Sequence, residues 1–304
     1  MPPALVAAVT GGKGGTGKSF VATNIAVLLS RQLELLLADL DVEAPNDHLL
    51  LGATRLENEE PIAVFFPLID YNRCTACGAC AKACDTGAIV MARGTPPMVM
   101  PRLCSGCRAC LYACPYNAIS SEGRRVIGYT YSTPIRRSGG FRLVTGLLRE
   151  GEEHTPPAVV AAKRRALRET PDEGLLIVDT GAGTGNSISA AIQEAELVIA
   201  VTEPTPLGLH DLKAILEIAR GMGKRIWLVV NRAGIAGHEK HVELAKAYGA
   251  EKTFLIPFDP QAARSYARGA PAVEECPACP ASKALQELAQ ALLAEAREKG
   301  VKAK

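Results

Sequence analysis

The sequence predicts an α/β fold, in which a doubly wound, mostly parallel sheet carries an inserted small α+β domain. Short apolar runs of strand length alternate with helical stretches along most of the chain. A glycine-rich loop at residues 12–19 joins the first such strand to the first helix. Two tetracysteine runs within residues 71–114 interrupt the alternation, and they mark the inserted domain.

The strands and helices of the larger frame follow from local patterns. Apolar runs as long as buried strands occupy residues 5–9, 35–38, 175–178, 197–201, 225–230 and 253–256. Helical stretches occupy residues 20–31, 157–169 and 207–220. Strands that alternate with helices at crossover spacing favour a doubly wound parallel sheet. We expect Gly139 and Gly140 to belong to a linker that returns the chain from the insert to this frame.

Composition narrows the possible partners. The chain has 304 residues, of which 48% are hydrophobic and 22% charged, as in soluble globular proteins. A net charge of +2 gives no electrostatic argument for a nucleic-acid partner or an anionic membrane, and we expect no nucleic acid and no stable membrane association. No apolar run approaches the roughly 20 residues of a membrane span, and no secretory signal opens the chain. We therefore expect a cytoplasmic protein.

The last amphipathic segment, at residues 281–299, has a leucine stripe with a mixed acidic and basic opposite face. Membrane-surface helices favour a basic polar face, so core packing is the better interpretation of this stripe. Its members are Leu285, Leu288, Leu292 and Leu293.

The two cysteine runs have the spacing CxxCxxCxxxC, and the second run ends in Cys-Pro. The x2 spacing lets a tight loop wrap three sulfurs around one iron–sulfur cubane, and in the bacterial ferredoxin pattern the fourth cysteine of each run ligates the other cluster. The expected ligands of one [4Fe–4S] cluster are Cys74, Cys77, Cys80 and Cys114. Those of the second [4Fe–4S] cluster are Cys104, Cys107, Cys110 and Cys84.

An internal repeat accompanies the cysteines, because residues 71–89 align with residues 101–119 at a constant offset of thirty. The segment resembles the pseudo-twofold two-cluster ferredoxins. Zinc and disulfides are the alternatives. Zinc prefers thiolates in pairs with a longer gap between them, and disulfides belong to oxidising compartments.

The glycine-rich loop has the order strand, loop, helix that phosphate binding requires. Glycines let successive backbone N–H groups point at phosphates, Lys18 would reach the β- and γ-phosphates, and the Ser19 hydroxyl would ligate Mg²⁺. The residues expected around the phosphates are Gly12, Gly14, Gly15, Thr16, Gly17, Lys18 and Ser19.

Residues 13–19, KGGTGKS, match the deviant Walker A motif of the MinD/ParA/Mrp ATPases and the nitrogenase iron protein. This resemblance implies ATP as the ligand and an ATP-sandwich homodimer. It also implies a role for the additional lysine, Lys13, which would cross to the partner's nucleotide.

Further segments extend the resemblance along nearly the whole chain. Residues 39–46 resemble switch I, in which Asp41 would position the attacking water, although a helix-capping carboxylate is the alternative. Residues 175–185 resemble the Walker B and switch II segment, in which Asp179 would hold Mg²⁺ through water. This chain has Gly181 where the family often has proline. The resemblance also places Asn231, Arg232 and Pro257 around the adenine base.

The predicted domains are a discontinuous P-loop ATPase domain, residues 1–66 and 124–304, and an inserted ferredoxin domain, residues 67–123. The leading hypothesis is an ATPase in which nucleotide state gates electron transfer through two [4Fe–4S] clusters to a protein redox partner. The alternatives are an ATPase that assembles or carries iron–sulfur or other metal clusters, and a redox-sensing adaptor that binds ATP without significant turnover.

Two smaller pairs remain. Cys276 and Cys279 form a late CxxC that could hold a third cluster between two subunits, form a redox or zinc pair, or stay unligated. His238 and His241 lie on one helical face, but without a third ligand nearby in sequence we expect a solvated pair.

Overall fold

The computed structural model describes residues 3–12 and 14–304, and they form two compact units. The sheet unit comprises the residues up to Glu60, together with Thr130–Leu147 and Val159–Lys304. The cysteine unit comprises Pro61–Tyr129 and Leu148–Ala158. The predicted domain boundaries, at residues 67 and 123, lie a few residues inside the longer segment of the cysteine unit.

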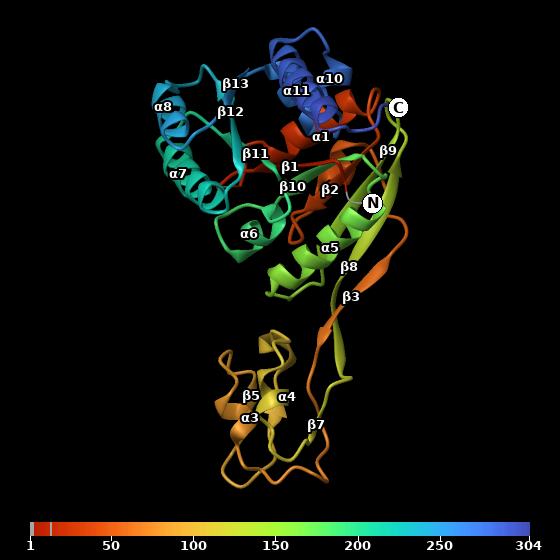
Figure 1. Cartoon of the computed structure of the whole chain (residues 1–304), viewed down its shortest axis with the longest axis vertical. Helices are drawn as coiled ribbons and strands as arrows, with labels where there is room; N and C mark the ends of the chain where they lie inside the picture. The colour runs from red at the N-terminus through yellow and green to blue at the C-terminus, as the bar shows by residue number, and fades with distance from the viewer. Residues whose placement is uncertain (1–2, 13) are drawn as a thin grey trace. The chain divides into compact units, whose positions relative to one another are not determined.

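A nine-stranded sheet has the order β13-β12-β11-β1-β10-β2-β9-β8-β3 (Figure 1). Every neighbouring pair from β13 to β9 is parallel, which confirms the predicted mostly parallel α/β sheet. The strands are β1 (Leu5–Thr10), β2 (Leu35–Leu40), β3 (Glu60–Phe65), β8 (Arg124–Ile135), β9 (Phe141–Leu148), β10 (Leu175–Thr180), β11 (Leu197–Thr202), β12 (Arg225–Ala233) and β13 (Lys252–Pro257).

Helices cover both faces of the parallel strands (Figure 1). One face carries α1 (Lys18–Leu29), α10 (Ala272–Glu275) and α11 (Pro280–Glu298), and the other carries α6 (Asn186–Ile192), α7 (Pro206–Gly221) and α8 (Glu239–Ala247). The central strands are therefore buried on both sides, which explains their unbroken apolar runs. The remaining helices are α2 (Asp47–Leu50) and α9 (Pro260–Ala267) of the sheet unit and α5 (Thr155–Glu169), whose first turn belongs to the cysteine unit.

The leucine stripe of α11 lies in the core cluster beside α1 and the sheet. This position was predicted from the mixed acidic and basic residues on the opposite face of the segment. Leu285, Leu288 and Leu292 are fully buried, and Leu293 is nearly so. Among the described residues, no helix combines the length and the apolarity that crossing a bilayer requires.

The expected linker around Gly139 and Gly140 is wrong, because these glycines form the turn between two long strands, β8 and β9. Gly140 has a φ of +73°, and a Cβ on Gly139 would lie 1.8 Å from the backbone oxygen of Ser30. The glycines therefore serve a tight turn packed against the end of α1, and they do not mark a flexible connection. β9 pairs in parallel with β2 and so extends the sheet.

The cysteine unit is built from two copies of one small motif. Its elements are β4 (Leu68–Ile69), α3 (Ala79–Lys82), β5 (Ile89–Val90), β6 (Met98–Val99), the 3₁₀ turn Pro101–Leu103, α4 (Ala109–Ala113) and β7 (Ile119–Ser120). β4 pairs antiparallel with β7, and β6 pairs antiparallel with β5, which is the same pairing displaced by thirty residues.

Backbone detail repeats at the same offset. The N–H of Asp70 donates to the Ala118 oxygen, and the N–H of Met100 donates to the Ala88 oxygen, each at 2.7 Å. Left-handed backbone conformations occur in three matching pairs, which are Ala76 and Gly106, Gly78 and Arg108, and Gly87 and Asn117. Non-glycine residues occupy this region rarely, so the repeated geometry reflects one loop shape built twice.

Candidate functional site

The glycine-rich loop lies between β1 and α1, and it closes against the end of β12. Gly17 has a φ of +96°, and a Cβ at this position would lie 2.2 Å from Nδ2 of Asn231. The same Nδ2 donates to the backbone oxygen of Thr16 at 2.9 Å. Glycine is required at position 17 both by the left-handed backbone and by the close approach of Asn231.

A cleft of about 460 Å³ opens beside this loop, within the 300–1,000 Å³ range of small-molecule sites. Glycines of the loop and the start of α1 form one wall, and the loop after β13 forms the opposite wall. Its lining comprises Gly14, Gly15, Gly17, Lys18, Ser19, Phe20, Asp41, Ala44, Asn46, Ala182, Asn231, Arg232, Ile256, Pro257, Phe258, Asp259, Ala262, Ala263, Tyr266 and Ala281.

Lys18 is the first residue of α1 and is 6% exposed. Burial lowers the pKa of its ammonium group, and the nearby carboxylates of Asp179 and Asp41 oppose that shift. A lysine at a helix start, next to open backbone N–H groups, creates a positive site for a phosphate chain.

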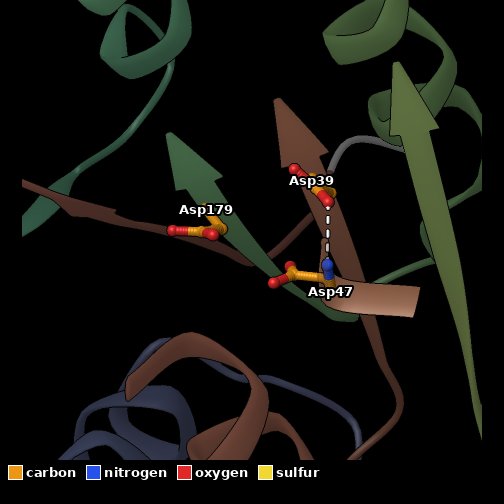
Figure 2. Close-up of side chains that lie close together, drawn as sticks. All are labelled: Asp39, Asp47 and Asp179. Atoms are coloured by element: carbon orange, nitrogen blue, oxygen red, sulfur yellow. Dashed lines mark hydrogen bonds between the residues drawn. The ribbon is translucent and has the colours of Figure 1, made fainter. Parts of the chain in front are cut away.

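Three buried carboxyl groups lie behind the loop, where the strands β2 and β10 end (Figure 2). They belong to Asp39, Asp47 and Asp179, and each offers an oxygen within 4.8 Å of the others. Burial raises the pKa of Asp39 and Asp47 well above the ordinary value, and it raises the pKa of Asp179 to about 7. Ser19 and Lys18 limit the shift at Asp179 by stabilising its anion.

Asp39 organises the segment that follows β2. Its Oδ1 accepts the N–H of Asp41 at 3.1 Å, and its Oδ2 accepts the N–H groups of Asn46 and Asp47 at 3.0 and 3.1 Å. The chain therefore curls around one buried carboxyl group, and this curl directs Asp41 and Asn46 into the lining of the cleft. Sequence reasoning did not identify Asp47, which has no local signal beyond its place after Asn46.

The residues around Asp179 fit Mg²⁺. Oδ2 of Asp179 accepts a hydrogen bond of 2.6 Å from the Ser19 hydroxyl. Its Oδ1 is buried and accepts no hydrogen bond from the described residues that the geometry supports. A hydroxyl and a carboxylate beside a phosphate site are the oxygen ligands that Mg²⁺ uses in nucleotide-binding loops.

The structure brings most of the predicted nucleotide residues to this cleft. Gly14, Gly15, Gly17, Lys18, Ser19, Asp41, Asn231, Arg232 and Pro257 line it. Thr16 lies just behind the lining, and the Gly12 oxygen accepts the N–H of Gly183 at 3.0 Å, which joins the loop to the segment after β10. Lys13 lies outside the described residues.

Two aromatic residues of the cleft were missed by sequence reasoning. Phe20 and Tyr266 pack edge to face with ring centroids 6.3 Å apart, and Tyr266 is 44% exposed. Their partnership depends on α9 packing beside α1, which no local pattern reveals. Gly181 lies next to Asp41, since a Cβ on Gly181 would be 3.3 Å from Asp41 Oδ1.

The eight cysteines of the cysteine unit line two separate hollows. The four in one hollow are Cys74, Cys77, Cys80 and Cys114, and those in the other are Cys84, Cys104, Cys107 and Cys110. Each hollow therefore contains three thiols of one run and the fourth thiol of the other run. Among the described residues, no three thiol sulfurs lie within 4.8 Å of one another.

The thiols differ in their surroundings. Burial raises the pKa of Cys80 and Cys104, and it raises the pKa of Cys110 to about 11. At Cys84 burial is outweighed by hydrogen bonds from Thr86 and the backbone, so its pKa is lowered. The N–H of Ala118 donates to the Cys114 sulfur at 3.3 Å, a contact that would stabilise a thiolate ligand.

The two remaining pairs belong to the sheet unit. Cys276 and Cys279 lie between α10 and α11, with sulfurs 2.7 Å apart. The expectation of a solvated histidine pair is wrong for His241, which is 4% exposed and has Nε2 3.1 Å from the Thr205 oxygen. His241 is buried because its face of α8 packs against the start of α7.

Residues 7–272 match the CobQ/CobB/MinD/ParA nucleotide-binding domain. The chain belongs to this family. A relative of uncharacterized function from Methanocaldococcus jannaschii is 31% identical over 269 residues, which cover 88% of this chain and 91% of the relative. An uncharacterized ATP-binding protein of the same organism is 23% identical over 304 residues, 99% of this chain and 92% of that protein.

Solved structures of MinD and related proteins share the fold of this MinD/ParA-family chain. The septum site-determining protein MinD of Pyrococcus horikoshii, complexed with Mg-ADP, superposes with a TM-score of 0.60 at 19% identity, over 97% of this chain and 98% of that one. The cell division ATPase MinD of Pyrococcus furiosus gives a TM-score of 0.58 at 18% identity, over 94% of this chain and 97% of that one.

These comparisons confirm the resemblance predicted from the KGGTGKS loop, and with it a nucleotide-binding P-loop fold. The ferredoxin insert, the iron–sulfur ligands, the redox partner and the homodimer stay predictions, as do the individual roles of the site residues.

Proposed function

We propose that this MinD/ParA-family protein is a Mg²⁺-dependent ATPase in which nucleotide state gates electron transfer through two [4Fe–4S] clusters to a protein partner. The observation that carries the proposal is the crossed grouping of eight thiols in a chain that also has a phosphate-binding cleft. The three-plus-one arrangement is that of bacterial two-cluster ferredoxins.

The cleft supplies the parts that phosphoryl transfer needs. Lys18 would neutralise the β- and γ-phosphates, while Ser19 would ligate Mg²⁺ and Asp179 would hold it through water. Asp41 lines the cleft, and its carboxylate would orient a water molecule toward the γ-phosphate. The water oxygen then bonds to the γ-phosphorus, and the bond from that phosphorus to the bridging oxygen of ADP breaks. The products are ADP and inorganic phosphate.

The absence of a tight thiol group among the described residues favours cubanes over zinc. Zinc–sulfur bonds of about 2.3 Å place tetrahedral thiolates about 3.8 Å apart. The sulfurs in each hollow do not form such a tight group, since no three of the described thiols lie within 4.8 Å. In a cubane each thiolate binds a different iron atom, so the four thiolates lie farther apart than around one zinc ion. When bound, each cluster would supply a one-electron carrier.

Chain continuity offers a route for coupling. β2 ends in the segment that carries Asp39 and Asp41, and its neighbour β9 lies beside β8, which continues from the sheet unit into the cysteine unit. A change in switch I on nucleotide binding would therefore act on strands near those that lead to the cysteines. The homodimer is part of the proposal, with Lys13 reaching the partner's nucleotide.

The test is anaerobic and has two stages. Purified protein should contain close to eight irons and eight acid-labile sulfides per chain, because two cubanes need four of each. Cluster potentials and ATP affinity are then measured in oxidised and reduced protein, with and without a non-hydrolysable ATP analogue. A tenfold change in affinity corresponds to about 59 mV for a one-electron couple, and the two shifts must agree by linkage.

Three outcomes would redirect the proposal. Stoichiometric zinc without labile sulfide would overturn the clusters. Iron that leaves on ATP hydrolysis would favour the cluster-carrier alternative. Turnover at background rate in both redox states would favour the redox-sensing adaptor.

A further inference from the structure

We propose that Cys276 and Cys279 form a thiol–disulfide exchange site whose oxidation state is coupled to the nucleotide cleft through Asp259. The coupling, though not the disulfide, rests on the nucleotide binding proposed above. Cys276 follows the last turn of α10, and Cys279 is the N-cap residue of α11. The turn between them is closed by the N–H of Cys279, which donates to the Cys276 oxygen at 3.0 Å.

The two sulfurs are placed for a bond to each other. Their separation of 2.7 Å is shorter than the roughly 3.8 Å between thiolates that share one zinc ion. The hydroxyl oxygen of Ser282 lies 3.3 Å from the Cys279 sulfur and 3.9 Å from the Cys276 sulfur. The pair therefore fits a dithiol that closes to a disulfide better than a metal clamp.

The difference in exposure between the two thiols indicates which of them reacts first. Cys276 is partly exposed, whereas Cys279 is 6% exposed. The Cys276 thiolate would attack a sulfur of a small disulfide such as oxidised glutathione, and one glutathione thiolate would leave. The Cys279 thiolate would then attack the Cys276 sulfur of the mixed disulfide and expel the second glutathione. Two protein thiols are oxidised, their two protons pass to the two glutathione thiolates, and one glutathione disulfide is reduced.

Asp259 joins this pair to the cleft. Its carboxylate accepts the N–H of Gln261 at 2.8 Å, at the start of α9, and the N–H of Ala281 at 3.4 Å, at the start of α11. The Cys279 thiol lies two residues before Ala281 and donates to the Ser282 hydroxyl at 3.3 Å, in the same first turn of α11. Asp259 and Ala281 line the nucleotide cleft, so one carboxylate ties the lining to the thiol pair.

Oxidation changes the turn that leads into this contact. A disulfide has no proton, so the Cys279 sulfur would lose its hydrogen bond to Ser282 at the start of α11, where the Ala281 N–H reaches Asp259. We expect the oxidised protein to bind Mg-ADP about fivefold more weakly, at the lower end of usual allosteric coupling. By linkage, saturating Mg-ADP should make the dithiol harder to oxidise. The same fivefold factor equals about 20 mV for a two-electron couple.

The experiment uses full-length protein kept free of oxygen and equilibrated in buffers of varied glutathione ratio. Thiols are trapped by rapid alkylation, and peptide mass spectrometry follows the Cys276–Cys279 peptide separately from the eight other cysteines. Mg-ADP affinity is measured in the same samples. The peptide should pass in one two-electron step from doubly alkylated to disulfide, and affinity should fall with it.

Two variants separate the coupling from general damage. Cys276→Ser cannot form the disulfide but keeps the Cys279 thiol, so its affinity should match that of the reduced protein in every buffer. Cys279→Ala lacks the thiol that donates to Ser282 at the start of α11, so its affinity should match that of the oxidised protein even under reduction. Wild-type affinity in reduced Cys279→Ala would overturn the coupling.

The alkylation result does not depend on nucleotide binding. A pair that stays doubly alkylated at every glutathione ratio, that stops at a mixed disulfide, or that retains iron or zinc would overturn the exchange site. Absence of Mg-ADP binding in reduced protein would instead overturn the proposed ATPase and the coupling with it.

Discussion

Ser19 Oγ donates a hydrogen bond of 2.6 Å to Asp179 Oδ2, although the two residues are 160 positions apart in the chain. The first belongs to the start of α1 and the second to β10, and β10 pairs with β1 through Ala8 and Val178, close to Asp179. The fold alone thus places a hydroxyl and a carboxylate side by side, so the two protein groups proposed for Mg²⁺ are organised before the ion arrives.

The ion should bind more tightly as pH rises through about 7. Burial raises the pKa of Asp179 from 3.8 to about 7, so the metal-free protein holds a proton there that Mg²⁺ must displace. The same shift means that this group stabilises the metal-free fold most at low pH and loses that contribution as pH rises from about 4 through about 7. Mg²⁺ titrations at several pH values, with ADP present, measure the first effect.

Asp179→Asn is the control for this pH dependence. An amide cannot titrate, so the variant should bind Mg²⁺ weakly and its Mg²⁺ affinity should vary much less over the same range. A variant that keeps the full wild-type pH profile would assign the titration to another group.

The two lysines of the loop should have separable effects. Lys18→Ala removes a buried charge that would face the phosphates, and we expect ATP affinity to fall about 100-fold or more. Lys13→Ala should bind ATP nearly normally and lose the hydrolysis that depends on dimer formation. Isothermal titration with a non-hydrolysable analogue and phosphate-release assays over a range of protein concentration measure the two effects. Equal losses of affinity in both variants would contradict the sandwich dimer.

Asp41→Ala should retain ATP binding and lose hydrolysis. The carboxylate lines the cleft without contributing a charge attraction to the phosphates, and removal of such a group costs about 100-fold to 10,000-fold in rate. The variant should accumulate as an ATP-bound dimer on size-exclusion chromatography. Glu43→Ala, which removes an exposed acid two residues away, provides a matched control and should hydrolyse ATP at the wild-type rate.

The crossed thiol groups predict which cysteine variants resemble each other. Cys84→Ser should disturb the same cluster as Cys104→Ser, and Cys114→Ser the same cluster as Cys74→Ser, because each pair lines one hollow. Electron paramagnetic resonance of the reduced proteins and iron content, which should fall from about eight to about four per chain, report the loss. Cys276→Ser should keep all eight irons. Paired effects within one run, such as Cys84 with Cys74, would contradict the crossing.

Features with local spacing were predictable from the sequence. The nucleotide loop, its flanking strand and helix, and the parallel strands all follow from contiguous patterns, and the structure confirms them. The thirty-residue repeat likewise predicted a repeated motif in the cysteine unit, and the structure adds matched left-handed residues such as Gly78 and Arg108. Each of these features is specified by a contiguous segment or a simple repeat of the sequence.

The rest depends on contacts between distant segments. β8 and β9 were missed because their glycine pair suggested a linker, whereas the turn is fixed by packing against Ser30. Asp47 and His241 were missed or misjudged because a polar residue at a helix start normally faces water, and only the arrangement of neighbouring helices buries these two. Tyr266 was missed because only the packing of its helix against a distant part of the chain places it in the cleft.

The position of β10 between β1 and β2 has a consequence for synthesis. β1 and β2 leave the ribosome early, but the strand that separates them in the sheet starts only at Leu175, after both cysteine runs. At about 5–20 residues per second, this interval lasts on the order of ten seconds. Within this interval the phosphate loop lacks Asp179, and by its end all eight cysteines of the two runs have been synthesised. The order of the chain would thus let the proposed iron–sulfur loading precede completion of the nucleotide site.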